Sequence, residues 1–292
     1  MIVNPRCLCY NTNSSKKKEV RAMTLLCPVC SKILHREGNS VRCENNHCFD
    51  FAKEGYLNLL AGNHKKGSDM GDNKDMALSR RAFLSKGYFD TLLHAVDEIF
   101  KSRCKEDASV LDICCGEGYY SATLKQRHPD ADIIGFDLSK EMIRLAAKRK
   151  SGNTYVVANL FHIPVPDNSI DFAFHLFAPF DETEFMRVLK PGGILVTAVA
   201  GENHLWQMKE ILYENPYKND EKPPRTSIPF AEKLRADGKI LLDNNEDIFS
   251  MFKMTPYFYH TPSEGIAKLQ QVPQLETEIS FALYIYQKPL AE

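Results

Sequence analysis

The sequence has no long hydrophobic run and almost no excess charge of either sign. Its longest apolar stretches, such as Ile194 to Ala200, are far shorter than the roughly 20 residues that a helix needs to cross a bilayer. Hydrophobic residues make up 43% of the 292 residues and charged residues 26%, which excludes a disordered chain, a collagen and a long coiled coil. The formal net charge of −1 gives the chain as a whole no attraction to a polyanion. We therefore expect a globular protein with no membrane partner.

The charge is unevenly distributed along the chain. Residues 1–90 hold 15 basic against 9 acidic side chains, a surplus of +6, whereas residues 91–292 hold 22 against 29, a balance of −7. Such an asymmetry hints at a polyanion-binding end, although a solvated basic face has the same composition.

The N-terminal region contains no hydrophobic stretch of the kind found in a secretory signal peptide. The nine cysteines are an odd number, which disfavours a secreted disulfide framework, and we expect a cytoplasmic protein with metal-binding thiols. Residues 1–23 are rich in Asn, Ser and Lys and show no hydrophobic period. They are predicted to form a flexible extension, with Met23 as the expected natural start.

A metal site is predicted shortly after this extension. Cys27 and Cys30 form a Cys-x2-Cys turn, and Cys43 follows with His47 and Cys48 close behind it. Two such knuckles supply the four ligands that close a tetrahedron around zinc, so that a structural site is expected. The spacing leaves open whether His47 or Cys48 is the fourth ligand. Two buried thiols and a surface histidine would be the alternative.

Basic residues mark the connecting segment. Lys65 and Lys66 lie in a glycine-containing polar stretch, and Arg80 and Arg81 lie on a helix predicted from Asp72 onward. The arginines either contact phosphates or form a hydrated helix face. We predict that Lys65, Lys66, Arg80 and Arg81 bind RNA.

A strand, a small-residue turn and a helix follow in the second half of the chain. Gly116 and Gly118 lie in this turn, and a second strand ends at Asp137 about twenty residues later, as in folds that bind nucleotide cofactors. Cys114 stands where the first glycine is usual, and a cysteine is tolerated there if its φ stays negative. Such a turn serves both NAD and S-adenosylmethionine. We favour S-adenosylmethionine because Asp112 can reach its charged amino-acid end and Asn159 suits its adenine edge.

Strands and helices alternate through this half, which predicts an α/β fold with a parallel, doubly wound sheet. The predicted strands are 155–158, 170–174 and 194–199, and the predicted helices are 141–150 and 182–189. An antiparallel edge strand is predicted over 277–287.

Together these residues resemble the 23S ribosomal RNA guanine-N1 methyltransferases of the RlmA type. The similarity extends from Cys27 to the C-terminus, and its most specific part lies between the zinc knuckles and the glycine turn. The shared motifs are Cys27-Pro28-x-Cys30, Phe51-Ala52-Lys53-Glu54-Gly55-Tyr56-x-Asn58-Leu59-Leu60, His64-Lys65, Gly71-Asp72, Arg80-Arg81-Ala82-Phe83-Leu84, Leu111-Asp112-Ile113, Gly116-Glu117-Gly118-Tyr119-Tyr120 and Met254-Thr255-Pro256.

The resemblance implies a class I (Rossmann-like) methyltransferase domain and an N-terminal zinc ribbon that helps to recognise 23S rRNA. It also implies a homodimer whose paired ribbons frame an RNA-binding cleft. Known members modify one of two nearby guanines in a hairpin loop of the peptide exit tunnel, and one branch confers macrolide resistance. The family's zinc ligands match Cys27, Cys30, Cys43 and His47, which leaves Cys48 outside the site.

The family's cofactor-binding residues match Gly116, Glu117, Asp137 and His204, and a family tyrosine falls at Phe89, where the hydroxyl is lost. The chain is expected to comprise a flexible extension (1–23), a zinc-ribbon RNA-recognition domain (24–60), a linker with helices (61–105) and a methyltransferase domain (106–292).

The acceptor pocket is expected at the loop Phe177–Pro179, because ligands lie beyond the carboxyl ends of such strands. Guanine N1 carries a proton that must leave, and His64, Asp72 and His175 are candidate bases. His175 could equally be a core residue, and Asp72 a helix N-cap.

Two other functions remain open from the sequence alone. A zinc ribbon could bind nucleic acid beside an inactive nucleotide fold, with Cys114 as the defect. Alternatively, the enzyme could methylate a small molecule, with the ribbon as scaffold.

Overall fold

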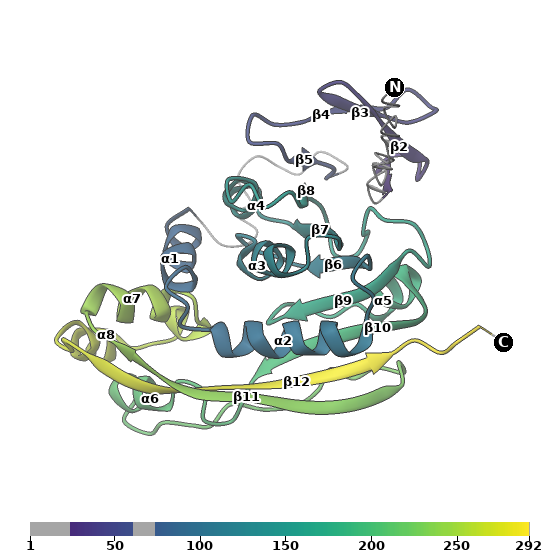
Figure 1. Cartoon of the computed structure of the whole chain (residues 1–292). Helices are drawn as coiled ribbons and strands as arrows, with labels where there is room; N and C mark the ends of the chain where they lie inside the picture. The colour runs from purple at the N-terminus through teal and green to yellow at the C-terminus, as the bar shows by residue number, and fades with distance from the viewer. Residues whose placement is uncertain (1–23, 61–73, 292) are drawn as a thin grey trace, which may run out of the picture.

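The computed structural model describes residues 24–60 and 74–291. Within them, the first part of the chain forms a small antiparallel sheet of four short strands in the order β1-β2-β3-β4 (Figure 1). Each strand has few residues, and the buried Leu34 and Val41 belong to a core that also contains Cys27 and Cys43 and continues into the rest of the described chain. The strands are β1 (Leu25–Leu26), β2 (Ile33–Glu37), β3 (Ser40–Arg42) and β4 (Cys48–Asp50).

The rest of the chain is built on a sheet of eight strands in the order β11-β12-β10-β9-β6-β7-β8-β5. The six strands from β10 to β5 are parallel, and β12 runs antiparallel to both β10 and β11. The strands are β5 (Leu57–Asn58), β6 (Ser109–Ile113), β7 (Asp132–Asp137), β8 (Thr154–Val157), β9 (Ile170–Leu176), β10 (Leu189–Ala200), β11 (Phe230–Leu242) and β12 (Leu275–Gln287).

Helices cover both faces of this sheet. The core residues of β6 and β9 alternate between the faces: Val110 and Phe172 pack with α2 and α3, whereas Leu111 and Ala173 pack with α5. The helices are α1 (Lys74–Leu84), α2 (Asp90–Arg103), α3 (Tyr119–Arg127), α4 (Lys140–Ala147), α5 (Glu182–Val188), α6 (Trp206–Leu212), α7 (Asn245–Lys253) and α8 (Ser263–Gln270), with a 3-10 turn at Pro256–Tyr259. None of these helices is long and apolar enough to span a membrane.

The predicted α/β class is confirmed, with one difference at the sheet edge. The segment 277–287 was expected to be an edge strand, but β12 lies between β10 and β11, and β11 forms the edge. β12 pairs with β11 over its whole length, from Leu242↔Leu275 to Phe230↔Tyr286. Burial explains the placement, because nearly every residue of β12 is buried whereas β11 is largely exposed.

The small sheet is joined directly to the large one. β5 follows β4 closely and pairs in parallel with β8, with Leu57 opposite Val156. The Leu59 N–H donates to the Val157 carbonyl at 2.9 Å, and the Leu26 N–H donates to the Pro164 carbonyl at 2.9 Å. These backbone bonds fix the position of the ribbon on the large sheet.

Candidate functional site

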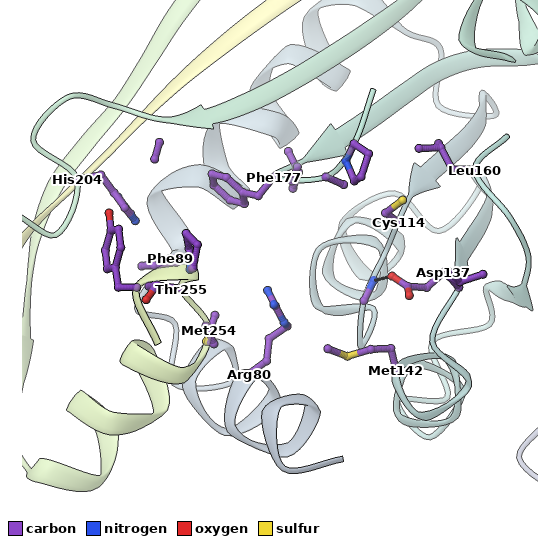
Figure 2. A pocket seen from close by; sticks show the side chains of 18 of the residues that line it. Arg80, Phe89, Cys114, Asp137, Met142, Leu160, Phe177, His204, Met254 and Thr255 are labelled. Atoms are coloured by element: carbon purple, nitrogen blue, oxygen red, sulfur yellow. Dashed lines mark hydrogen bonds between the residues drawn. The ribbon is translucent and has the colours of Figure 1, made fainter. Parts of the chain in front are cut away.

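A cavity of about 570 Å³ lies at the carboxyl ends of the central strands. The sheet order reverses between β6 and β9, which is where ligands bind in open parallel sheets. It is lined by the residues that directly follow four strands, Cys114, Leu138, Ala158 and Phe177, and by Ala200, the last residue of β10. Figure 2 shows side chains from the strand ends facing side chains from α1 and from the segment after α7. The observed location agrees with the predicted pocket mouth.

The turn after β6 approaches the cavity with an unusual backbone. Cys114, Gly116 and Gly118 all have positive φ, at 55°, 55° and 76°. A Cβ on Gly118 would lie 2.8 Å from both the Ala146 Cβ and the Tyr155 hydroxyl, so that only glycine fits there. The condition under which a cysteine was expected to be tolerated here, a negative φ, is not met, because the chain already reverses at this residue. Cys114 therefore holds a strained conformation against the cavity.

Asp137 links this turn to the cavity. Its Oδ2 accepts the Gly116 N–H at 3.0 Å, and its Oδ1 accepts the Ser139 N–H at 2.8 Å. The carboxylate lies at the end of β7 and lines the cavity, where it can also accept hydrogen bonds from a ribose diol (Figure 2). The predicted role of Asp137 agrees with this position.

Asp112 lies deeper, in an annex of about 60 Å³ beside the main cavity. The carboxyl group is buried and its Oδ2 has no hydrogen-bond partner within the described residues. Burial raises the pKa of Asp112 to about 8, and hydrogen bonding from Ser121 lowers it only in part. An unpaired buried carboxyl is costly unless a ligand supplies a partner. The ammonium group of S-adenosylmethionine is such a partner, so that the residues present fit this cofactor.

Glu117 also lines the annex, but it is held by the protein. It forms a buried ion pair with Arg149, whose Nε donates to its Oε2 at 2.8 Å. Burial raises its pKa, and the neighbouring arginines oppose that shift. Glu117 therefore anchors the start of α3, and its predicted contact with the cofactor stays a prediction.

Beyond the end of β8, apolar side chains line a part of the cavity that suits a flat ring. Met142, Leu160 and Phe161 line the cavity there together with Asn159. The Asn159 Oδ1 accepts the Phe161 N–H at 3.1 Å, which leaves the side-chain amide as a donor. This arrangement suits an adenine edge, as predicted for Asn159.

His204 and Phe89 line the other end of the cavity, with ring centroids 5.6 Å apart. The His204 Nδ1 accepts the Ser280 N–H at 3.1 Å, so that the remaining proton is on Nε2. Burial lowers the pKa of His204 to about 3. His204 is therefore a neutral hydrogen-bond donor at neutral pH and not a base.

The structure separates the predicted basic residues. Arg80 lines both the cavity and its annex, whereas Arg81 donates from its guanidinium to the Leu145 carbonyl at 2.9 Å. Arg81 thus ties α1 to α4. The predicted RNA contacts of both arginines stay predictions, and Lys65 and Lys66 lie outside the described residues.

Of the three candidate bases, the described part of the chain contains only His175. His175 is buried in β9, and its Nε2 is 2.7 Å from the Pro179 carbonyl, while its Nδ1 has no partner within the described residues. Burial lowers its pKa, and it is not among the residues that line the cavity. The structure therefore places His175 in the core. His64 and Asp72 lie outside the described residues.

Two parts of the cavity wall were not anticipated. Asn219, far from any predicted motif, is held by the buried Lys209 Nζ at 2.7 Å and by the Tyr257 hydroxyl at 2.9 Å. The shared motif Met254-Thr255-Pro256 forms the adjoining wall, although its sequence alone gave no role. The sequence contained a hint only for Met254-Thr255-Pro256, which is one of the motifs shared with the family.

A second site lies in the small sheet. Ligand atoms of four residues lie within 4.8 Å of one another: Cys27, Cys30, Cys43 and His47. The Sγ atoms of Cys30 and Cys43 are 3.6 Å apart, and the His47 Nδ1 lies 3.4 Å from the Cys43 Sγ and 3.5 Å from the Cys27 Sγ. Tetrahedral ligands about 2.3 Å from zinc lie roughly 3.8 Å apart, so that the cluster fits a zinc ion. Cys48 is exposed and outside it.

Comparisons with known proteins agree with both sites. Residues 25–68 match the family described as RlmA, N-terminal, a zinc ribbon, and residues 110–193 match a methyltransferase domain. The 23S rRNA (guanine(748)-N(1))-methyltransferase of Streptomyces fradiae is 27% identical over 275 residues, which cover 91% of this chain and 97% of that protein. The YxjB protein of Bacillus subtilis is 26% identical over 93% of this chain and 100% of its own.

The methyltransferase half alone has wider similarity. A malonyl-[acyl-carrier protein] O-methyltransferase of Hamiltonella defensa is 32% identical, but over only 38% of this chain and 46% of that protein. The relatives that match most of this chain are thus named as 23S rRNA methyltransferases, whereas those that match the methyltransferase half alone include other enzymes. The chain combines an RlmA-type zinc ribbon with a class I S-adenosylmethionine-dependent methyltransferase domain, which confirms its resemblance to the RlmA-type 23S rRNA guanine-N1 methyltransferases.

Proposed function

We propose that this protein transfers a methyl group from S-adenosylmethionine to N1 of a guanine in 23S rRNA. The observation that carries the proposal is one continuous cavity with two different ends, beside a zinc ribbon. Gly116 and Asp137 line one part of the cavity, and His204 and Thr255 line another (Figure 2). Phe89 and Phe177 line both the cavity and the annex that contains Asp112. Cavities of about 300–1,000 Å³ hold ligands of drug-like size, so that a cavity of about 570 Å³ has room for a cofactor and part of a second ligand.

The chain's own residues bind and orient, and the bound cofactor supplies an electrophilic methyl group. Guanine N1 would accept this methyl group and release its proton to solvent. The turn at Gly116 and the carboxylate of Asp137 would hold the cofactor beside the acceptor, and positioning of this kind is a main contribution to catalysis. His204 takes no proton because burial keeps its pKa at about 3.

The ribbon is proposed to recognise the RNA. It lies at the β5 edge of the sheet, and exposed basic side chains such as Lys32, Arg36 and Lys53 are available for phosphates. Since the substrate is ribosomal, we propose that the protein works in the cytoplasm. The homodimer implied by the resemblance stays a prediction.

Primer extension on 23S rRNA tests the proposal directly. N1-methylguanine cannot form a Watson–Crick pair, so that reverse transcriptase stops beside it. We expect a stop in cells with the wild-type gene, no stop in cells without it, and restoration by wild type and by Asp130→Asn, which alters an exposed carboxylate away from the cavity. Asp137→Ala should not restore it. An identical stop pattern with and without the gene contradicts the proposal, and methylation of a free metabolite instead would favour a small-molecule methyltransferase.

A further inference from the structure

Phe177 is an exposed aromatic residue in the wall of the cavity. Its side chain is 46% exposed although it is a phenylalanine, and it lines both the main cavity and the annex that contains Asp112. The ring projects from the end of β9 into the cavity, between the side of Cys114 and the side of His204 (Figure 2). It therefore lies where the cofactor end and the second end of the cavity meet.

The backbone at Phe177 is held in a conformation that bulky residues rarely adopt, with φ at 59°. Its N–H donates to the Ala198 carbonyl at 3.2 Å, and its ring packs 5.7 Å from that of Phe281. Non-glycine residues with positive φ persist only where surrounding contacts impose them, and such sites are often functional. The positive φ therefore indicates that the orientation of the Phe177 side chain has a function.

His175 supplies one of the imposing contacts. Its Nε2–H donates to the Pro179 carbonyl at 2.7 Å, two residues beyond Phe177. The imidazole itself is fixed between Phe180 and Phe185, at ring-centroid distances of 5.9 and 5.4 Å. His175 thus stabilises the loop Phe177–Pro179 but does not line the cavity.

We propose that Phe177 is the stacking platform for the acceptor guanine and that His175 is a positioning residue that holds it there. This inference rests on the proposed function and deepens it. A base that leaves an RNA loop loses its stacked neighbours, and proteins replace them with aromatic faces. The other aromatic residues of the cavity are less suited. Phe89 is buried, the Tyr257 hydroxyl is bound to Asn219, and Phe161 lies beside Asn159 at the adenine end.

Phe177→Gly is the informative variant, because glycine removes the ring and accepts the positive φ without strain. We expect the kcat/KM for a 23S rRNA hairpin transcript to fall by about 5- to 150-fold, which corresponds to the loss of one base–aromatic stack. The Kd for S-adenosylmethionine, measured by calorimetry, should not change. Phe177→Tyr should retain activity. Phe230→Ala removes a similarly exposed aromatic ring on β11, away from the cavity, and should behave as wild type.

A fluorescent base gives a second readout. 2-Aminopurine placed at the guanine that primer extension identifies should be quenched on binding to wild type and not on binding to Phe177→Gly. His175→Leu should lower kcat/KM for the hairpin in the wild-type background and change it little in the Phe177→Gly background, since residues that act together are not additive. His175→Gln, which keeps a donor near the position of Nε2, should recover activity.

The outcomes are distinguishable. A wild-type protein that does not methylate 23S rRNA overturns the proposed function and the platform with it. An active wild type with Phe177→Gly within twofold of it, or with equal quenching in both, overturns the platform alone. Additive effects of His175→Leu and Phe177→Gly overturn the positioning role of His175.

Discussion

The zinc ribbon and the large sheet are stabilised by different means. In the ribbon, buried apolar side chains such as Leu25, Leu34 and Val41 are few, and three of the four clustered ligands are cysteines. The large sheet has a continuous core on both faces, with phenylalanines such as Phe172 and Phe174 fully buried. A segment as short as the ribbon buries too little surface to fold alone. Its fold therefore depends on the metal, and the fold of the sheet depends on packing.

The two regions nevertheless share one edge. β5 belongs to the large sheet through its pairing with β8, and Asn159 of the cavity wall follows β8 by two residues. If the ribbon recognises RNA as proposed, this edge determines where that RNA lies relative to the cavity. The difference in stabilisation thus predicts that each region can be disrupted with limited damage to the other.

Zinc removal is the largest expected effect on the ribbon. Structural zinc contributes apparent binding free energies of about 10–16 kcal/mol in isolated zinc-finger peptides, so that its loss should unfold this segment. We expect amide protons of residues 25–50 to lose protection from hydrogen exchange and methylation of rRNA to fall, while β6, β7 and β9 stay protected and S-adenosylmethionine still binds. Unchanged protection of the ribbon after verified removal of zinc would count against a structural site.

Gly118→Ala is expected to do the reverse and damage the cofactor site while the ribbon stays intact. The new Cβ would lie 2.8 Å from both the Ala146 Cβ and the Tyr155 hydroxyl. Overpacking of this kind costs typically 1–3 kcal/mol and occasionally more, which predicts an affinity loss for S-adenosylmethionine of about 10- to 100-fold, measurable by calorimetry.

Gly38→Ala is the matched control for this prediction. Gly38 also has a positive φ, at 63°, but its hairpin leaves open space around a new Cβ. A loss of folding stability common to both variants comes from backbone strain, and the larger loss in Gly118→Ala comes from the clash. Equal cofactor affinities in the two variants would show that the turn is not packed as described.

The sequence predicted the parts of the site that depend on short segments. The strand, turn and helix around Gly116 and the carboxylate at Asp137 follow from a local pattern. The spacing of the cysteines predicts the zinc site but leaves the fourth ligand open, and the family resemblance favours His47 over Cys48. The fold class follows from the alternation of strands and helices. In each case neighbours along the chain decide the structure.

The features of the site that the sequence did not predict depend on contacts between distant segments. Arg80 faces the cavity because α1 packs against both α4 and α7, and Asn219 does so because Lys209 and Tyr257 hold it. His175 has the same residue type as a catalytic base, and only its burial shows that it supports a loop. The positive φ of Cys114 likewise reflects the path of the chain after β6, which residue type alone does not specify.

Asp112→Asn should separate stability from binding within the large sheet. The pKa of Asp112 is about 8 in the folded protein and near 3.8 when unperturbed, so that the unfolded state loses this proton first as pH rises. The carboxyl therefore destabilises the fold progressively between about pH 4 and pH 8. In the absence of cofactor, the variant should be more stable than wild type by up to about 4 kcal/mol at pH 7 and equal to it below pH 4.

The same substitution should weaken binding of S-adenosylmethionine, because it removes the buried carboxyl group that we expect to pair with the ammonium group. Urea unfolding at pH 4, 6 and 8 and calorimetry at pH 8 measure the two effects. Asp107→Asn, at an exposed carboxylate, serves as control. A stability difference that is independent of pH would mean that Asp112 is not protonated in the folded protein.

Cys48→Ser is expected to have the smallest effect, and it tests how the ribbon selects its fourth ligand. Asn46 has a positive φ of 63°, and the Cys43 N–H donates to the His47 carbonyl at 3.1 Å, so that the chain turns the His47 ring back toward Cys43. Successive side chains of an extended segment point to opposite sides, and Cys48, the first residue of β4, therefore faces solvent.

We expect Cys48→Ser to keep one zinc per chain and a stability within about 0.5 kcal/mol of wild type. His47→Ala should weaken zinc binding and lower the zinc content found by elemental analysis after dialysis against a chelator, because three thiolates leave the fourth position to water. Loss of zinc in Cys48→Ser and retention in His47→Ala would reverse the assignment and require the turn at Asn46 to open.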